Sequence, residues 1–142
     1  MRVIAILGLM LTVSACAGAG ADGGLDLMSG GVARGKALEA RLKTAALSPL
    51  GSRDNPVRAN MPDGQRAYLA RLRCGDGAPP AFERMGSYGP GPFGSIIDGY
   101  RVTCAVAELK VREVFMDMYH PGHIEPAAVP GFAIVPPTAV KP

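Results

Sequence analysis

The sequence predicts a small α+β protein dominated by β-structure, with a small antiparallel sheet or partial barrel and one short N-terminal helix. Three observations support this fold class. Apolar and polar residues alternate along three stretches, at 66–74, 98–108 and 110–120. The four Tyr and four Phe residues all lie between positions 68 and 132, which places the core in that part of the chain. The length of 142 residues, with 19 Gly and 13 Pro, allows one small domain.

The first fifteen residues, MRVIAILGLMLTVSA, have the pattern of an export signal. Arg2 precedes an apolar run at 3–13. This run is too short for the roughly 20 apolar residues that a membrane-spanning helix needs. Small residues, Ser14 and Ala15, follow the run. The segment is therefore predicted to be a signal peptide that is removed from the mature chain.

Cys16 follows this segment, in the sequence Val13-Ser14-Ala15-Cys16. The motif resembles the lipobox of bacterial lipoproteins, in which the cysteine is acylated and the signal is cut just before it. The resemblance implies a periplasmic lipoprotein held to the lipid bilayer by acyl chains such as palmitate, since each buried CH₂ contributes about 0.8 kcal/mol. By resemblance to lipoprotein sorting in Gram-negative bacteria, Ala17 at the next position implies the periplasmic face of the outer membrane, with the inner membrane and the cell surface as alternatives. An ordinary cleaved signal with an incidental cysteine is the other interpretation.

The mature chain is expected to begin with a tether and a helix. Residues 16–31 contain the lipidated cysteine and a stretch rich in Gly and Ala, which is typical of a flexible tether. Residues 32–47 place Leu38 and Leu42 on one helical stripe, and Pro49 follows them. This pattern predicts a short amphipathic helix over 32–47.

The domain itself is expected over residues 48–136, with a disordered tail at 137–142. Basic and acidic residues balance within the domain, so we expect no nucleic-acid partner. Strands are predicted at 66–74, 98–108, 110–120 and 131–135. The short gap at 108–110 predicts a hairpin between the second and third strands, and Pro121-Gly122 predicts a turn that closes the third.

Two cysteines, Cys74 and Cys104, remain once Cys16 is assigned to lipid. Each lies on the apolar side of a predicted strand, and exported proteins fold in an oxidising compartment. A disulfide between them would close a loop of about 31 residues, which the chain-entropy model values at about 3.5–4 kcal/mol. A reactive thiol and a pair of unbonded buried cysteines are the alternatives, although the sequence has no C-x-x-C motif.

Two histidines, His120 and His123, flank the predicted turn. A β-turn brings such residues within about 7 Å between Cα atoms, close enough for two imidazoles to bind one metal ion. Met116 and Met118 share a strand face with His120, and thioether and imidazole ligands together suit copper. With Glu125 in place of the methionines the set would suit zinc. The alternative is that the methionines fill the core and the histidines are solvated.

Three arginines, Arg71, Arg73 and Arg101, have the outward parity of two predicted strands. Together they are a candidate contact for a carboxylate, a phosphate or a glycan. The alternative is a solvated face in which these arginines pair with nearby acidic residues.

The segment 86–95 is rich in Gly and Pro. Pro90 and Pro92 have no N–H groups to cradle a phosphate, so a rigid connection is the favoured interpretation. We expect Tyr88 and Phe93 to fold back over the sheet, with docking on a partner as the alternative.

No motif in the sequence predicts an enzyme, since G-x-S-x-G and H-E-x-x-H are absent. The blocks 66–74 and 117–120 resemble small exported bacterial proteins of unknown function, and this resemblance implies no activity. We therefore expect a non-enzymatic binding or structural module without a cofactor, with an envelope protein or a glycan as partner. A periplasmic copper- or zinc-binding protein that uses His120 and His123 is the second hypothesis. A small hydrolase with a site around 86–95 is the third.

Overall fold

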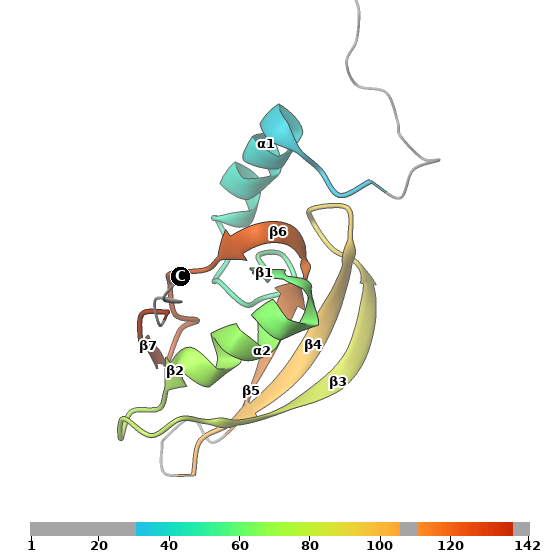
Figure 1. Cartoon of the computed structure of the whole chain (residues 1–142). Coiled ribbons are helices and arrows are strands. Elements are labelled where there is room, and N and C mark those ends of the chain that lie inside the picture. The colour runs from blue at the N-terminus through green and yellow to red at the C-terminus, as the bar shows by residue number, and fades with distance from the viewer. Residues whose placement is uncertain (1–30, 106–110, 138–142) are drawn as a thin grey trace, which may run out of the picture.

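A five-stranded mixed sheet forms the centre of the fold, and helix α2 lies across it (Figure 1). The computed structural model describes residues 31–105 and 111–137. The elements are α1 Gly35–Ala45, β1 Val57–Asn60, α2 Met61–Arg71, β2 Leu72–Arg73, β3 Ala81–Pro90, β4 Ile96–Thr103, β5 Val111–Asp117, β6 Tyr119–Ile124 and β7 Ala133–Ile134. The predicted signal, Cys16, nearly all of the tether, the 108–110 connection and most of the C-terminal tail lie outside the described residues.

The strand order is β3-β4-β5-β1-β6, and β2 pairs with β7 in a separate two-stranded sheet. Strands β3, β4 and β5 form antiparallel neighbours. Strand β1 runs parallel to β5, with Val57 opposite Met116, and β6 is antiparallel to β1. The predicted β-dominated α+β class is confirmed. The sheet is mixed because of the β1–β5 pair, and the described strands leave it open, with β3 and β6 at its edges.

Most predicted elements are found close to their expected positions. Helix α1 lies inside the predicted helix 32–47, strand β4 overlaps 98–108, and β7 lies inside 131–135. Strands β4 and β5 pair antiparallel, as the predicted hairpin requires. The predicted third strand is divided between β5 and β6.

The turn predicted at Pro121-Gly122 lies inside β6. Tyr119 is opposite Asn60 and Ile124 is opposite Ala59, so the residues between them bulge out of the ladder. Gly122 has a φ of +74°, which is the conformation expected at the third position of a type II turn. The chain therefore turns where the sequence predicts and then returns to the same neighbouring strand.

The strand predicted at 66–74 is wrong, because this segment forms most of α2 followed by the short strand β2. Pro62 lies in the first turn of α2, Asp63 follows it, and Arg71 lies in the last turn, all of which favour a helix. The buried residues have helical spacing: they are Gln65, Tyr68, Leu69 and Leu72. Ala70, which alternation places in the core, is exposed.

The core lies between α2 and the sheet. Its buried members are Val57, Ala59, Tyr68, Leu69, Leu72, Tyr100, Val102, Val114, Met116 and Val129. Helix α1 contributes little to burial, since Ala45 is its one buried residue. None of the helices within the described residues is long and apolar enough to cross a membrane.

The 86–95 segment packs on the domain, as predicted, but residues 86–90 belong to strand β3 and are not a connection. Phe93 is fully buried, and the Tyr88 ring meets Phe115 edge-on with centroids 5.1 Å apart. Gly99 on β4 makes room for Tyr88, because a Cβ at this position would overlap the tyrosine ring. The N-terminal side of α1 is tied to the same hairpin by a hydrogen bond from the Ala33 N–H to the Phe93 carbonyl.

Candidate functional site

A groove of about 650 Å³ lies beside α2 and is bounded on its other sides by β6 and the segment after β7. Three arginines line it: Arg58 on β1, Arg71 at the end of α2, and Arg73 on β2. The groove exists because α2 packs on the sheet with one side only. The opposite side of the helix, which includes Ala67 and Ala70, forms part of the wall.

Arg71 is held in place by bonds to the backbone. Its Nη1 donates to the Val135 carbonyl at 3.3 Å and its Nη2 to the Glu125 carbonyl at 2.7 Å. The guanidinium also lies over the Tyr68 ring, 5.7 Å from its centroid. These contacts join the end of α2 to the C-terminal segment and fix a positive charge in the wall of the groove.

Arg73 and Arg58 are held less tightly. Arg73 donates from Nη1 to the carbonyls of Ala70 and Leu72, which belong to its own stretch of chain. Arg58 is half-buried and makes no side-chain hydrogen bond or ion pair within the described residues. Both side chains therefore keep N–H donors that no described residue uses.

His123 and Glu125 form the polar part of the β6 side of the groove. The His123 Nε2 lies 3.2 Å from Glu125 Oε2, and the Ala127 N–H donates to Glu125 Oε1. Burial is the main cause that lowers the pKa of His123, and the nearby positive charge of Arg58 lowers it further, while Glu125 opposes both. His123 is therefore mainly neutral near pH 7.

The predicted set of three arginines is divided by the structure. Arg71 and Arg73 line the groove together, but the exposed side chain of Arg101 on β4 places its Nη1 3.5 Å from Glu83 Oε2. The prediction that all three share one surface is wrong, because it depended on treating 66–74 as a strand. Arg58 takes the place of Arg101, and nothing in the sequence pattern identified it.

His120 lies apart from His123 in a second, buried cluster with Ser95 and Asp117. The Ser95 hydroxyl donates to Asp117 Oδ2, and His120 Nε2 lies 3.4 Å from the same oxygen without a hydrogen bond of its own. Burial acts to raise the pKa of Asp117, but the His120, Ser95 and Tyr119 contacts outweigh it and lower the pKa. Because Ser95 donates to the carboxylate and not to the imidazole, the cluster does not have the order of a nucleophilic triad.

The predicted metal ligands are distributed over different environments. His120 is next to Asp117, His123 is next to Glu125, and Met116 is fully buried in the core. Within residues 31–105 and 111–137, no three or more His, Cys, Asp or Glu side chains converge as a metal site would require. Copper or zinc binding by His120 and His123 with Met116 and Met118 stays a prediction.

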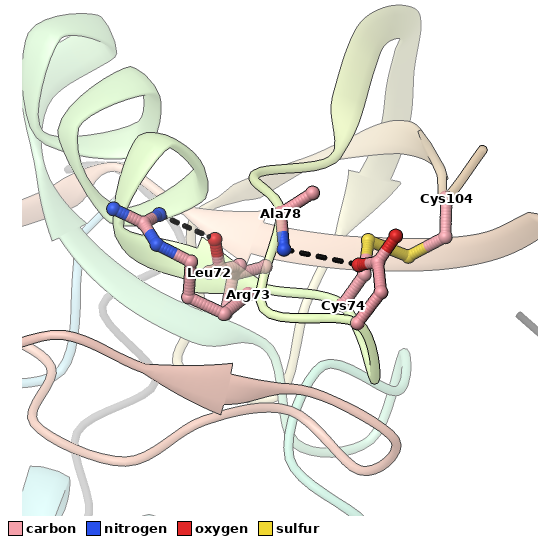
Figure 2. The surroundings of a disulfide bond; sticks show 6 residues. Leu72, Arg73, Cys74, Ala78 and Cys104 are labelled. Carbon is pink, nitrogen blue, oxygen red and sulfur yellow. Dashed lines mark hydrogen bonds between the residues drawn. A yellow bond between two sulfur atoms is a disulfide. The ribbon is translucent and has the colours of Figure 1, made fainter. Parts of the chain in front are cut away.

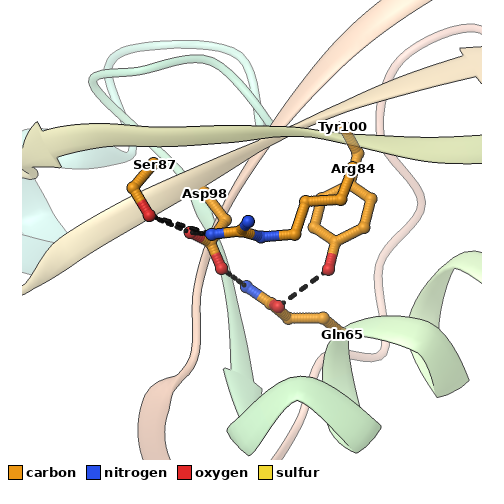
Figure 3. Close-up of polar contacts among 5 residues, drawn as sticks. All are labelled: Gln65, Arg84, Ser87, Asp98 and Tyr100. Carbon is orange, nitrogen blue, oxygen red and sulfur yellow. Dashed lines mark hydrogen bonds and ion pairs between the residues drawn. The ribbon is translucent and has the colours of Figure 1, made fainter.

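A third polar cluster joins the inner side of α2 to the sheet (Figure 3). Asp98 on β4 accepts hydrogen bonds from Arg84 at 2.7 Å and from Ser87 at 3.0 Å, both on β3. Its other oxygen accepts from Gln65 at 3.3 Å, and the Tyr100 hydroxyl donates to Gln65 at 2.9 Å. The cluster satisfies the polar atoms that the helix and sheet bury together.

The ionisation of Asp98 follows from these contacts. Burial acts to raise its pKa, but the hydrogen bonds from Arg84, Ser87 and Gln65, together with the positive charge of Arg84, outweigh burial and lower the pKa. Asp98 is therefore a carboxylate at neutral pH, and its role is to hold β3, β4 and α2 together.

The predicted disulfide between Cys74 and Cys104 is present, with the two Cα atoms 5.9 Å apart. Figure 2 shows that it joins the segment after β2 to the end of β4. The Cys74 N–H donates to the Ala78 carbonyl at 2.8 Å, which closes a tight turn beside the bond. The disulfide thus fixes the C-terminal side of the α2–β2 segment to the central sheet.

Comparison with protein-family models, with curated proteins and with solved structures found no match. Functional inference therefore depends on the geometry of the chain itself. Sequence analysis missed Arg58, Gln65 and Asp98. For Gln65 a signal existed, since it shares the helical spacing of Tyr68 and Leu69.

Proposed function

We propose that this protein is an exported lipoprotein whose disulfide-bonded domain is a non-enzymatic binding module. Acylated Cys16 anchors it at the periplasmic face of the outer membrane. The groove beside α2 is its binding site. The tether at 16–31 has a random-coil reach of roughly 20 Å, which lets the domain stand clear of the bilayer.

The Cys74–Cys104 disulfide is the observation that carries this proposal. Thiols in the cytosol are kept reduced, so a structural disulfide in a small domain favours an oxidising compartment. Both cysteines are 4% exposed, which suits a structural bond better than a redox-active pair. The segment 1–16 supplies an export signal and an acylation site that agree with that compartment.

The groove supports the binding part of the proposal. Ligand sites are concave, largely preformed and lined by apolar residues with a few placed polar groups. The groove is concave and combines apolar residues with a larger share of polar ones than is usual for such sites, among them Arg71, which two backbone carbonyls already fix. The carboxylates of Asp98 and Asp117, in contrast, are already engaged by hydrogen bonds from within the protein.

The anchor is tested by expressing the wild-type chain and Cys16→Ser in a Gram-negative host and separating the membrane and soluble periplasmic fractions. Wild-type protein is expected in the outer-membrane fraction, with a mass that shows loss of residues 1–15 and addition of two or three acyl chains. Cys16→Ser is expected to lose acylation and membrane retention. A Cys74→Ala variant is the matched control, because it removes a cysteine without touching the acylation site.

The proposal of a lipid anchor fails if Cys16→Ser remains in the membrane fraction. It also fails if the wild-type chain keeps its first fifteen residues and carries no fatty acid. The control variant Cys74→Ala is expected to remain in the membrane fraction, because its acylation site is intact.

A further inference from the structure

We propose that the groove beside α2 binds an oxyanion, a carboxylate or phosphate group carried on an apolar body, through Arg58 and Arg73. This inference rests on the proposed function in taking the groove as the binding site. It adds the chemical class of the ligand and the residues that contact its charge.

The positive charges of the groove are not matched by its acidic residues. Asp63 in the wall is paired with Arg66, while Glu125 contacts the mainly neutral His123 and a backbone N–H, so its single negative charge faces three arginines. The three groove arginines have no carboxylate within 4.0 Å among the described residues. These arginines are Arg58, Arg71 and Arg73. An oxyanion in the groove would supply the negative charge that these guanidinium groups lack.

The geometry of the bonds leaves donors for such a ligand. Arg73 uses only Nη1, on the Ala70 and Leu72 carbonyls, so its Nη2 and Nε have no described acceptor. Arg58 has no described acceptor for any of its N–H groups. A guanidinium presents paired donors that match an edge of a carboxylate or phosphate group. Each of these two arginines therefore has donors available for an oxyanion bound in the groove. Arg71 is a positioning residue here, because its bonds to the Val135 and Glu125 carbonyls hold the wall in place.

The rest of the lining favours an apolar group next to the charge. Ile124 is 60% exposed, and Val135 and Pro136 stand beside it in the wall. The Tyr68 hydroxyl is already engaged, because it donates to the Ala127 carbonyl and accepts from the Val129 N–H, so the tyrosine offers the groove mainly its ring. A small amphiphilic anion fits these features better than a polyanion, because the domain as a whole carries no net charge.

The experiment uses the full chain with Cys16→Ser, purified with its Cys74–Cys104 disulfide oxidised. Three probes of similar size are titrated by two-dimensional NMR: phenyl phosphate, benzoate and the neutral benzyl alcohol. Ligands of this size are expected to bind with dissociation constants on the order of millimolar. The two anions should shift the backbone signals of 58–73 and 123–125 in a saturable way, and benzyl alcohol should bind at least about tenfold more weakly. The ratio of the two anion affinities shows whether phosphate or carboxylate is the preferred source of the charge.

Variants then assign the contact. Arg58→Gln and Arg73→Gln should each weaken phenyl phosphate binding by about tenfold, the cost of one lost charged hydrogen bond. Arg101→Gln is the matched control, since it removes an exposed arginine outside the groove, and it should leave the affinity unchanged.

Each outcome bears on the inference. Equal binding of benzyl alcohol and phenyl phosphate, unaffected by Arg58→Gln and Arg73→Gln, would overturn the anionic class while leaving the groove as a binding site. Absence of saturable shifts at the groove with all three probes would overturn the inference and the binding part of the proposed function together. Neither result alters the test of the Cys16 anchor, which is made separately by fractionation.

Discussion

The two sides of α2 use the same kinds of residue in opposite ways. On the inner side, the carboxylate of Asp98 meets Arg84, Ser87 and Gln65, and each polar partner is satisfied within the protein. On the outer side, Arg58 and Arg73 line one groove, and neither has a carboxylate within 4.0 Å among the described residues. A cluster of charged residues is therefore a structural feature when its charges are matched, and a candidate binding site when they are not.

The two sides also differ in how firmly they are attached. The inner side is covered by the sheet, and the disulfide at the end of β2 joins the same segment to β4. Within the described residues, the outer side faces β6 and the C-terminal segment, which is held by the bonds of Arg71 and Tyr68. Substitutions on the inner side should therefore change the free energy of unfolding, and those on the outer side should change ligand binding.

The largest expected effect on stability comes from removing the disulfide. The double variant Cys74→Ala/Cys104→Ala should lower the free energy of unfolding by about 3.5–4 kcal/mol, since the bond joins residues 30 positions apart. Urea denaturation followed by circular dichroism measures the change, with the wild-type protein under reducing conditions as the control. A loss below about 1 kcal/mol would show that packing of α2 alone holds this segment to the sheet.

A smaller loss is expected from opening the Asp98 cluster. Asp98→Asn removes the charge that Arg84 pairs with and places an amide donor against other donors, so it should cost about 2 kcal/mol. The value is below that of a fully buried ion pair because the Arg84 side chain is 48% exposed to solvent. The midpoint of urea unfolding measures it.

Two matched variants sharpen this result. Asp54→Asn changes an exposed carboxylate that has no hydrogen bond among the described residues, and Arg58→Gln changes an unpaired arginine of the groove. Both should leave the unfolding midpoint within the error of wild type. If Arg58→Gln destabilised the protein as much as Asp98→Asn, the distinction between the two sides of α2 would be wrong.

Much of the fold was predictable because it follows local patterns. The alternation in β4 and β5 and the helix at 35–45 depend on spacing along the chain. The disulfide was predicted because Cys74 and Cys104 are the two cysteines that remain once Cys16 is assigned to lipid. The helical structure of α2 was not predictable in this way, because its core-facing position 65 holds a glutamine and its outer position 70 holds an alanine. Hydropathy does not identify a polar residue that is buried to bond Asp98, and the one signal for Gln65 is the helical spacing that it shares with Tyr68 and Leu69.

The candidate site was only partly predictable for a related reason. Arg71 and Arg73 were singled out, but their grouping with Arg101 assumed the wrong element. Arg58 reaches the groove through the parallel pairing of β1 with β5 and through the fold of β6 onto β1. Pairing between strands so far apart in the chain leaves no pattern in a single sequence.

The smallest expected effect is a two-step loss of stability with acid. The folded-state pKa of His123 is lowered by burial, by Arg58 and by His120, with Glu125 opposing them, so protonation of His123 favours the unfolded chain. Stability should therefore begin to fall as the pH drops below about 6.5, the pKa of an unfolded histidine. The lowered pKa values of Asp98 and Asp117 act in a separate range. The stabilisation that these two aspartates provide is complete above about pH 4, which is the pKa of aspartate in an unfolded chain. It is lost as the pH falls through their lower folded-state pKa values.

Two variants separate the steps, and they belong to opposite sides of α2. Urea midpoints measured from pH 8 to pH 3 should lose the upper step in His123→Gln and should show a weaker lower step in Asp98→Asn. A pH profile of His123→Gln that is identical to wild type would mean that this histidine is as well solvated in the folded protein as in the unfolded chain. Because an anion beside Arg58 would offset the charge that lowers the pKa of His123, phenyl phosphate should also raise that pKa, as measured by the imidazole NMR signals. A histidine pKa that stays constant while the groove signals saturate would place the bound charge away from Arg58.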